Sequence, residues 1–473
     1  MKRKTMGLMF TIIITSQIFL MMPLFALGAI NVPELSAQGK KINVKLQAKL
    51  FKDKVAGNGL EGVGVIKKDK IDGDDNKYPQ ENVIALAAFY TRFARSGNSE
   101  CDQWATDAVF PSISAMGSDM LERIEDEKDY YTLDQAIALE FLSLGYSRSQ
   151  NQEMLNLMEN LYKSLIDFES SDSEINGYDD AYWRAINKIG DKIGGSGYEY
   201  CYTNITLMAI AGMLKFGMTV KGMTIDNDEQ YYTTSITIAK DAIEFCEDKC
   251  FFNGSGFMEY PYADMVSPET KNYYARTQII AALAYTRLYE ATKEIGYLDK
   301  AEMMVKYIIT KNFLDTGKTG GVVTYLSTAT GIKSSTKLGY DNALYAYVLI
   351  SLYNAIGDKG IGHLKRAEEI AVFMHDNLFY ESGDGEIVGY IELLVDNDIP
   401  DGYKRIYFNT NALMMIVNEE IAFSERPWFI KYLWWIIFGA IGVIAVIVIV
   451  VLVKRKKDIG RKLPKLVKGL VED

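Results

Sequence analysis

Histidine and cysteine are scarce in this chain, and their scarcity narrows the chemistry it can perform. The 473 residues include only two histidines, His363 and His375, and four cysteines. Neither histidine lies close to a cysteine in the sequence, so the ligand spacing of a zinc site does not occur. We therefore expect no metal site built from these residues.

Several sequence motifs of catalysis and ligand binding are also missing. The chain contains no GxSxG nucleophile motif and no HExxH zinc motif. The stretch GDKGIG at 357–362 is not preceded by the strand that a dinucleotide or phosphate loop requires. The acid-rich stretches DKIDGDDNKY and DNDIPDG do not match the spacing of a calcium-binding EF-hand, so we interpret them as solvated turns. We predict no cofactor.

Positive charge is lacking except at the two ends. The net charge of the chain is −11. The C-terminal segment 454–473 contributes +5 and the start MKRK contributes +3, so the remainder carries −19. Binding to nucleic acid needs a basic surface, so this balance argues against a nucleic-acid partner.

Both ends of the chain carry long apolar segments. Residues 1–30 combine a cationic start, an apolar run and small residues, as a secretory signal peptide does, although an uncleaved anchor remains an alternative. Residues 432–453 are 22 residues without a charge, which is enough to cross a membrane as a helix. Tryptophans lie at one edge of the segment 428–453, and KRKK follows it. These features predict a single-pass cell-membrane protein, with its N-terminal ectodomain outside and the basic tail 454–473 in the cytoplasm.

All four cysteines lie in the predicted ectodomain, where an even number permits two disulfides with three connectivities. A bond between Cys246 and Cys250 would strain a regular helix. The sequence leaves the pairing open.

The ectodomain repeats itself. Residues 273–313 and 339–379 each contain an apolar helix, a glycine-containing turn and a second helix, and LYEAT in the first matches LYNAI in the second at an offset of 64. A glycine-rich turn and a short β-prone stretch follow each helix pair. The period of 62 to 66 residues indicates one repeating domain, 81–427, after an N-terminal extension with short strands, 31–80.

Apolar residues at three- and four-residue spacing predict further helices. The predicted helical ranges are 82–95, 133–145, 152–168, 180–189, 203–216, 231–247, 277–289, 298–309, 343–353, 364–375 and 411–423. The ranges 203–216, 277–289 and 343–353 are apolar nearly all round, whereas 298–309 and 364–375 carry a charged face. Helices of the first kind are buried and those of the second lie outside. The predicted fold is therefore all-α, an (α/α) toroid of helical hairpins with short β-hairpins between the units, plus one C-terminal transmembrane helix.

The second repeat unit resembles part of a known protein family. YDNALYAYVLISLYNAIGD, then LKRAEEI, then NLFYESGDGEIVGY is similar to a hairpin of the six-hairpin glycosidase-like (α/α) barrels, which include the N-acylglucosamine 2-epimerases and related hydrolases. The resemblance is clearest over 198–423. It implies a substrate cleft where the inner helices begin. It also implies that an epimerase would depend on histidine, whereas both histidines here fall on a predicted outer helix.

Hydrolysis of a glycosidic bond commonly needs two carboxyl groups. Our first candidate is Asp341, at the start of a predicted inner helix, and the others are Asp179, Asp180 and Glu259. Each has a structural alternative: Asp341 and Asp180 could be helix N-caps, and Glu259 could lie on an exposed hairpin.

The candidate substrate-binding residues follow from positions near the starts of the inner helices and the adjoining hairpins. They are Tyr274, Arg276, Asn342, Asn204, Tyr340, Trp183 and Glu199. Trp183 could stack on a sugar ring or belong to the core, and Glu199 could also lie on an exposed hairpin.

Two functions remain open from the sequence. The first is a membrane-anchored, extracytoplasmic carbohydrate-active enzyme, a glycoside hydrolase with paired carboxylates. The second is a non-catalytic ectodomain that binds a glycan or a surface protein on the same toroid. The predicted partner is a carbohydrate or a cell-surface glycan. A subunit of a membrane complex, assembled through its transmembrane helix, is a third class.

Overall fold

The computed structural model describes residues 78–122, 129–169, 182, 185–187, 202–223, 227–251, 256–259, 272–310, 313–315, 320–327, 334–381, 388–396, 399 and 406–424. The chain divides into two compact units, Met1–Ala422 and Phe423–Asp473. The account below concerns the first unit. The predicted signal peptide, transmembrane segment and tail lie outside the described residues, as does all of the N-terminal extension except its last three residues.

The described chain is mostly helical. Its helices, in chain order, are α3 (Pro79–Ser96), α4 (Ser99–Trp104), the π-helix η1 (Ala105–Val109), α5 (Phe110–Ala115), α6 (Thr132–Ser149), α7 (Gln152–Ile166), α8 (Thr203–Val220), α9 (Asp228–Cys250), α10 (Ala275–Thr292), α11 (Ile295–Thr310), α12 (Gly339–Ile356), the 3-10 helix η4 (Gly357–Gly360), α13 (Ile361–Leu378) and α14 (Phe408–Ser424).

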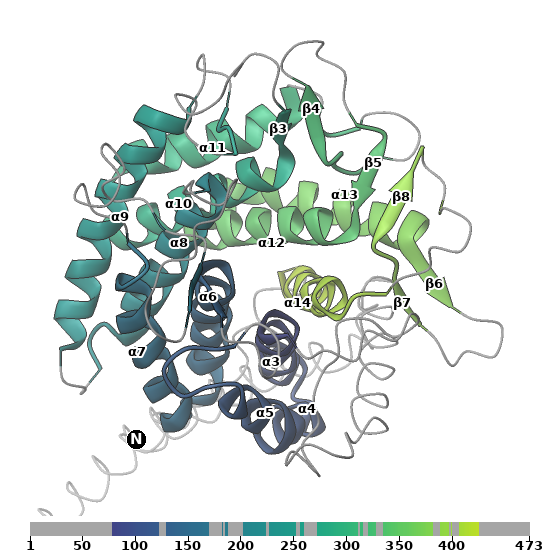
Figure 1. The fold of residues 1–473 in the computed structure, drawn as a ribbon. Helices are drawn as coiled ribbons and strands as arrows, with labels where there is room; N and C mark the ends of the chain where they lie inside the picture. The colour runs from purple at the N-terminus through teal and green to yellow at the C-terminus, as the bar shows by residue number, and fades with distance from the viewer. Residues whose placement is uncertain are drawn as a thin grey trace, which may run out of the picture. The chain divides into compact units, whose positions relative to one another are not determined.

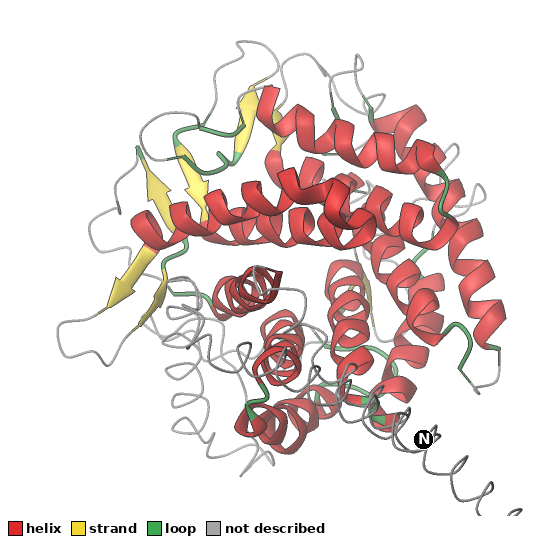
Figure 2. Ribbon diagram, turned by 180° about the vertical axis from the view of Figure 1, so that it is seen from behind, coloured by secondary structure: helices red, strands yellow, loops and turns green. Residues whose placement is uncertain are grey.

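Short strands connect the helical hairpins. The strands are β1 (Asp129–Tyr131), β2 (Ala185–Asn187), β3 (Asn272–Tyr274), β4 (Tyr325–Ser327), β5 (Thr336–Leu338), β6 (Phe379–Glu381), β7 (Val388–Tyr390) and β8 (Leu393–Val395). They form the antiparallel pairs β1–β2, β3–β4, β5–β8 and β6–β7. Strands β1, β3 and β5 each run directly into an inner helix, so the strands β3–β8 gather near the starts of α10 and α12 (Figure 2).

The helices form an inner and an outer layer (Figure 1). The inner helices α3, α6, α8, α10 and α12 pack side by side in chain order, and α6, α8, α10 and α12 each also pack against the helix that follows in the chain. Helix α14 closes the inner ring, because Glu420 accepts hydrogen bonds from Arg95 of α3. This arrangement confirms the predicted alternation of buried inner helices and amphipathic outer helices.

Every inner helix starts with the same local pattern. A tyrosine precedes five of the six helices (Leu338 precedes α12), and the fourth residue of each helix is an amide or a threonine. These fourth residues are Asn82, Gln135, Thr206, Gln278, Asn342 and Asn411. The five amides donate to the carbonyl of the residue before the helix.

Four of these amides also hold the preceding loop. Each exchanges two hydrogen bonds with the backbone of one residue that precedes its helix. The pairs are Gln135 with Leu121, Gln278 with Phe257, Asn342 with Val322, and Asn411 with Tyr390 at the end of β7. We call these residues the amide clamps. They satisfy buried backbone groups that the irregular loops cannot pair among themselves.

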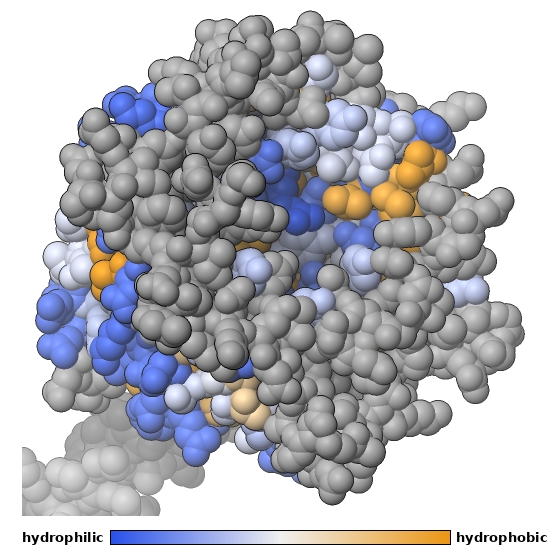
Figure 3. Space-filling model, in the orientation of Figure 1, coloured by the Kyte–Doolittle hydropathy of each residue, from blue (hydrophilic) through white to orange (hydrophobic). Residues whose placement is uncertain are grey.

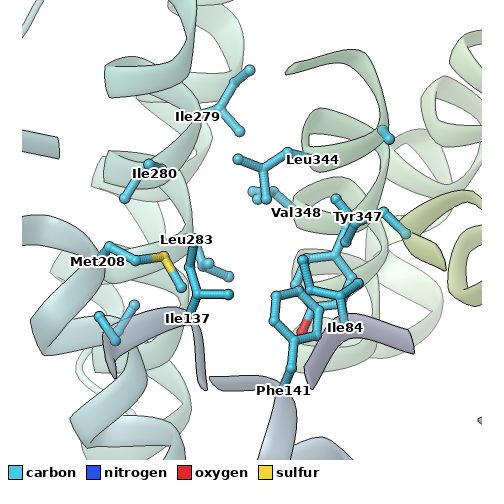
Figure 4. Close-up of a cluster of buried hydrophobic side chains, with 14 of the residues drawn as sticks. Ile84, Ile137, Phe141, Met208, Ile279, Ile280, Leu283, Leu344, Tyr347 and Val348 are labelled. Atoms are coloured by element: carbon cyan, nitrogen blue, oxygen red, sulfur yellow. The ribbon is translucent and has the colours of Figure 1, made fainter. Parts of the chain in front are cut away.

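Apolar side chains fill the middle of the inner ring. Ile84, Ile137, Met208, Leu283 and Val348, which come from α3, α6, α8, α10 and α12, converge in this region (Figure 4). All five are at most 3% exposed. The inner helices therefore carry polar groups toward their two ends, with an apolar layer between them.

Two secondary-structure predictions were wrong. A helix was predicted over 180–189, but Ala185–Asn187 is strand β2, paired with β1, and Tyr182 forms an isolated β-bridge with Glu169. This stretch belongs to a connection between hairpins, where pairing with β1 overrides local helical periodicity. The helices α4 and α5, with η1 between them, were not predicted. Asn98 caps α4 by accepting from the backbone of Glu100 and Cys101.

One cysteine bears on the disulfides that the sequence permits, and the most apolar described helix is buried, as predicted. Cys250 carries a free thiol, so the two disulfides that four cysteines permit are not both formed. Within the described residues, α8 is long and apolar enough to cross a membrane, with a mean hydropathy of 1.3. Because 78% of this stretch is buried inside the protein, α8 has the character of a core helix.

Candidate functional site

Buried polar side chains gather where the inner helices begin, and we call this end of the ring the mouth. The third residue of five inner helices is polar and buried: Glu81, Asp134, Thr277, Asp341 and Thr410. Helix N-termini carry a partial positive charge that stabilises nearby carboxylates. The three acids of this set are thus placed in the first turns of α3, α6 and α12.

Asp341 pairs with a cation of the neighbouring inner helix. Its Oδ1 lies 2.6 Å from Nε of Arg276 in α10, and its side chain is 2% exposed. Helix α12 begins at Gly339 after Leu338, and no side chain caps it. The N-cap alternative for Asp341 is therefore not realised, and its carboxylate instead connects two inner helices at the mouth.

Arg276 is the part of this pair that solvent reaches, since its side chain is 36% exposed. Its guanidinium carbon lies 5.0 Å from the ring centre of Tyr340, as in a cation–π contact. Burial acts to lower the pKa of Arg276, but the charge of Asp341 outweighs it and raises that pKa. The guanidinium therefore stays charged and presents donors at the surface of the mouth.

Glu392 supplies a second carboxyl group next to Asp341. It is 6% exposed, accepts a 2.6 Å hydrogen bond from Thr410 Oγ1, and accepts from the backbone N–H of Tyr340 at 3.2 Å. Burial raises the pKa of Glu392 to about 7, and the negative charge of Asp341 adds to this rise. The two carboxyls thus interact electrostatically.

Gly339 allows the segment that carries Glu392 to lie close to the start of α12. A Cβ atom at Gly339 would lie 2.8 Å from the carbonyl oxygen of Ile391, so any side chain there would displace the segment that carries Glu392. Sequence reasoning missed Glu392, because the link between this hairpin and the start of α12 is a tertiary contact.

Two further acids of the mouth were also missed. Asp134 accepts a hydrogen bond from Gln80 of α3, and the charge of Glu81 contributes to the raised pKa of Tyr340, of which burial is the main cause. Glu81 and Asp134 directly precede the fourth-residue amides Asn82 and Gln135, as Asp341 precedes Asn342. This repeated pair of a polar residue and an amide is the sequence signal that could have identified them.

The structure gives Asn342 a scaffold role. It is fully buried, and its amide is bonded to the backbone of Val322 and Leu338 as one of the amide clamps. Both of its N–H groups and its carbonyl are therefore already engaged beneath the mouth. A substrate would meet its neighbours Tyr340 and Asp341 before it met this amide.

The remaining described candidates lie at the starts of α8 and α10. Asn204 is the second residue of α8, and Glu259 accepts from the N–H of Thr203 through its backbone carbonyl. Burial raises the pKa of the Glu259 side chain. Tyr274 precedes α10 and packs near Tyr325, with ring centres 6.0 Å apart.

Four candidates, Asp179, Asp180, Trp183 and Glu199, lie outside the described residues. Tyr182, in the same stretch, is described and fully buried. Its N–H donates to Thr206 Oγ1 at 3.1 Å, which anchors this point of the chain to the start of α8.

Hydrophilic residues are visible in a hollow on the face of the molecule shown in Figure 3. Among the described residues, no group of three histidine, cysteine or acidic side chains is arranged to hold a metal ion. What the described part of the mouth offers is therefore paired carboxyls, one accessible guanidinium and aromatic rings. These groups can bind sugar hydroxyls and can transfer protons.

Comparison with known proteins places this architecture. No family model matches the sequence, and no curated protein matches it. Solved structures do match: cellobiose 2-epimerase from Bacillus thermoamylovorans superposes with a TM-score of 0.62 at 14% identity, covering 82% of this chain and 99% of the other. The GH76 alpha-mannanase of Bacteroides thetaiotaomicron gives 0.60 at 14% identity, covering 81% and 94%.

A third match is an alpha-1,6-mannanase from a Salegentibacter species in complex with alpha-1,6-mannotriose, an inactive variant with two adjacent aspartates changed to asparagine. Its TM-score is 0.54 at 15% identity, covering 82% of this chain and all of the other. The fold is that of the six-hairpin glycosidase-like (α/α) barrels. At 13–15% identity these likenesses establish the fold alone.

Proposed function

We propose that this six-hairpin barrel is a carbohydrate-active enzyme that hydrolyses a glycosidic bond at its mouth. The observation that carries the proposal is the pair Glu392 and Asp341. Burial and the charge of Asp341 raise the pKa of Glu392 to about 7, whereas Asp341 itself is ion-paired with Arg276. Two neighbouring carboxyls in such different environments can divide the roles of acid and base.

In this mechanism Glu392 is the general acid. A carboxyl with a pKa of about 7 is about half protonated at neutral pH and can protonate the leaving oxygen in that form. Asp341 acts as the carboxylate that activates water or attacks the sugar. Arg276, which reaches solvent, binds sugar hydroxyls and orients Asp341.

The solved structures support this class of substrate. The neighbours include an alpha-mannanase and a mannanase bound to an oligosaccharide. Two adjacent aspartates were changed in that inactive mannanase. This chain has adjacent aspartates at Asp179 and Asp180, near the anchoring residue Tyr182, so we keep both as further proposed catalytic acids.

Hydrolysis is favoured over epimerisation by the position of the histidines. Both lie in the outer helix α13, where His363 is 3.5 Å from Glu302 of α11 and His375 packs against Phe379. An epimerase of the resembled type would need histidine in the cleft. The described part of the mouth instead presents carboxyl groups.

The test is an assay of the full chain on alpha- and beta-linked oligosaccharides, with product analysis that separates hydrolysis from epimerisation. We expect Asp341→Asn and Glu392→Gln each to reduce turnover by at least about 100-fold, in the range for loss of a proton-transfer group. Asp376→Asn, which removes an exposed acid of α13, is the matched control. Full turnover in both mouth variants would refute the proposal. Activity lost only in Asp179→Asn or Asp180→Asn would move the catalytic pair to that segment.

A second function is favoured by one observation. Asp341 and Glu392 are both nearly buried and already bonded to protein groups, as in a structural pair. A ring of this kind would bind a glycan without cleaving it. Glycan-array binding by the wild-type chain, unchanged in Asp341→Asn and accompanied by no turnover, would support this alternative.

We further propose that the barrel is the ectodomain of a single-pass cell-membrane protein, tethered by residues 428–453, with the tail 454–473 in the cytoplasm. The uncharged run and the basic residues after it support this proposal. Protease added to intact cells should digest the barrel and spare an epitope tag on the tail. Digestion of the tag with the barrel protected would reverse the orientation.

A further inference from the structure

A pocket lies at the end of the inner ring opposite the mouth, which we call the base. Its volume is about 510 Å³, and the last turns of α6, α8, α10 and α12, with the residues that follow them, line it. The lining residues used here are Lys215, Glu290, Lys293, Ser147, Thr219 and Asn354. Pockets of this size hold small organic molecules.

Three carboxylates beside this pocket, Glu140, Glu290 and Glu420, are matched in formal charge by three guanidinium groups, Arg95, Arg148 and Arg287. Arg287 donates several hydrogen bonds to Glu140 and one of 2.5 Å to Glu290. Nearby, Glu420 accepts from Arg95 and Arg148. The described carboxylates of the base are thus bound to guanidinium groups, and none of them is an ion-pair partner of a pocket lysine.

The ammonium of Lys215 has no contact partner in the described part of the chain, although Glu290 and Glu140 attract it electrostatically. Its ammonium forms no ion pair or hydrogen bond with any residue that the structure describes. Burial lowers its pKa, and the repulsion of Arg287 is the largest electrostatic cause, ahead of the attraction of Glu290. An anion in the pocket would relieve this repulsion and hold the ammonium in its charged form.

A second lysine faces the same space. Lys293 follows α10 in a left-handed conformation, with a φ of 61°, and lines the pocket together with Lys215. The helix C-termini around the pocket carry partial negative charge, which favours cations at this end. The three guanidinium groups equal the three carboxylates in number, so Lys215 and Lys293 are the excess formal positive charge at the base. Hydroxyl and amide groups of Ser147, Thr219 and Asn354 add hydrogen-bonding capacity.

We propose that the basal pocket binds a compact oxyanion, a phosphate or carboxylate carried by a small organic molecule, with Lys215 and Lys293 as its charge partners. The pocket is larger than an inorganic ion needs, so the anionic group belongs to a larger molecule. Lys215 is 12 residues beyond the first residue of α8, about 18 Å along the helix axis from the mouth. The site is therefore separate from the proposed sugar-cleaving site and does not depend on it.

The test is calorimetric titration of the purified full chain at constant ionic strength, with inorganic phosphate, glucose 6-phosphate and glucuronate as separate probes. Sodium chloride replaces each probe in the reference titration and controls for screening. We expect saturable binding, with an organic anion binding more tightly than inorganic phosphate. The stronger of the two organic probes identifies phosphate or carboxylate as the preferred group.

Variants locate the binding. Lys215→Met, which keeps the chain length and removes the charge, should weaken binding at least about tenfold, because it removes one of the two proposed charge partners of the anion. Lys293→Gln should weaken it less, because this lysine is exposed. Lys359→Gln removes an exposed lysine from η4 at the same end of α12 and should leave the affinity unchanged.

Two results would overturn this assignment. One is the absence of saturable binding by all three probes. The other is equal affinity in wild type, Lys215→Met and Lys293→Gln, since any bound anion would then lie elsewhere. Circular dichroism of each variant confirms folding, and Lys293→Gln keeps the test decisive if Lys215→Met does not fold.

Discussion

The two ends of the inner ring use charge in opposite ways. At the mouth, acids lie at helix N-termini, and the pairing cation Arg276 is partly exposed. Toward the base, guanidinium groups enclose carboxylates, and both Arg287 of α10 and Glu140, in the middle of α6, are at most 3% exposed. The acids at the mouth and the cations toward the base agree with the helix dipoles. The mouth, however, keeps Glu392, whose pKa is raised by burial and by the charge of Asp341, whereas most charges of the base are paired. This contrast separates a region suited to chemistry from one suited to stability.

The largest stability effect should come from the base. Arg287→Met would leave Glu140 buried without its guanidinium partner, which typically costs about 3–5 kcal/mol. Urea unfolding measures the loss. The double variant Glu140→Gln with Arg287→Met should recover much of it, because both charges are then absent. If the double variant is as unstable as the single one, the pair contributes through packing and not through charge.

The next effect is a pH dependence that originates at the mouth. Folding raises the pKa of Glu392 from 4.5 to about 7, so between these pH values the folded protein binds more protons than the unfolded chain. This contribution is complete below pH 4.5 and is lost as the pH rises to about 7, on the order of 3 kcal/mol.

Denaturant unfolding of Glu392→Gln across this pH range should show a flatter profile than the wild type. Glu381→Gln, at an exposed acid of β6, serves as the control. Parallel profiles for the wild type and Glu392→Gln would show that Glu392 titrates at an ordinary pKa.

An intermediate effect is expected from the amide clamps. Asn342→Ala removes the hydrogen bonds to Val322 and Leu338 and leaves buried backbone groups unpaired, a loss of about 1–3 kcal/mol. Thermal unfolding gives the stability, and a matched turnover assay shows whether catalysis remains. A fully stable Asn342→Ala variant that has lost turnover would instead place this amide in substrate binding.

The smallest stability effect is expected for Asp341→Asn. The partner that it leaves unpaired, Arg276, is 36% exposed and can be solvated, so the loss should be about 1 kcal/mol or less. Unfolding of this variant beside Glu140→Gln tests the contrast directly. A loss at Asp341 as large as that at Glu140 would make the mouth a structural ion-pair site and weaken the enzymatic proposal.

The ring could be predicted from the sequence because its signals are local. Helices 203–216, 277–289 and 343–353 are apolar all round, and the repeated hairpins place them in one layer. The segment 99–115 was missed because it is broken into two short helices by a π-helix, which hides its periodicity. The strand at Ala185–Asn187 forms by pairing with Asp129–Tyr131, which lies more than 50 residues away in the chain.

The residues of the candidate site that lie at helix starts could be predicted from the repeat, and the one that lies beside a strand could not. Asp341 and Arg276 were placed at the starts of neighbouring inner helices by their position in the repeat, and the structure pairs them. Glu392 could not be placed in this way, because it approaches Asp341 only when β8 pairs with β5. Glu81 and Asp134 share the helix position of Asp341 and became recognisable once the amide pattern was known.

Under the proposed function, the apolar layer in the middle of the ring limits how a polysaccharide could bind. Because Ile84, Leu283, Val348 and their neighbours occupy the axis, a sugar chain cannot be threaded from one end of the barrel to the other (Figure 4). Whatever enters at the helix N-termini must leave by the same opening. A polymer must therefore either lie across that opening or insert one terminus, and each round of binding ends with withdrawal along the path of entry.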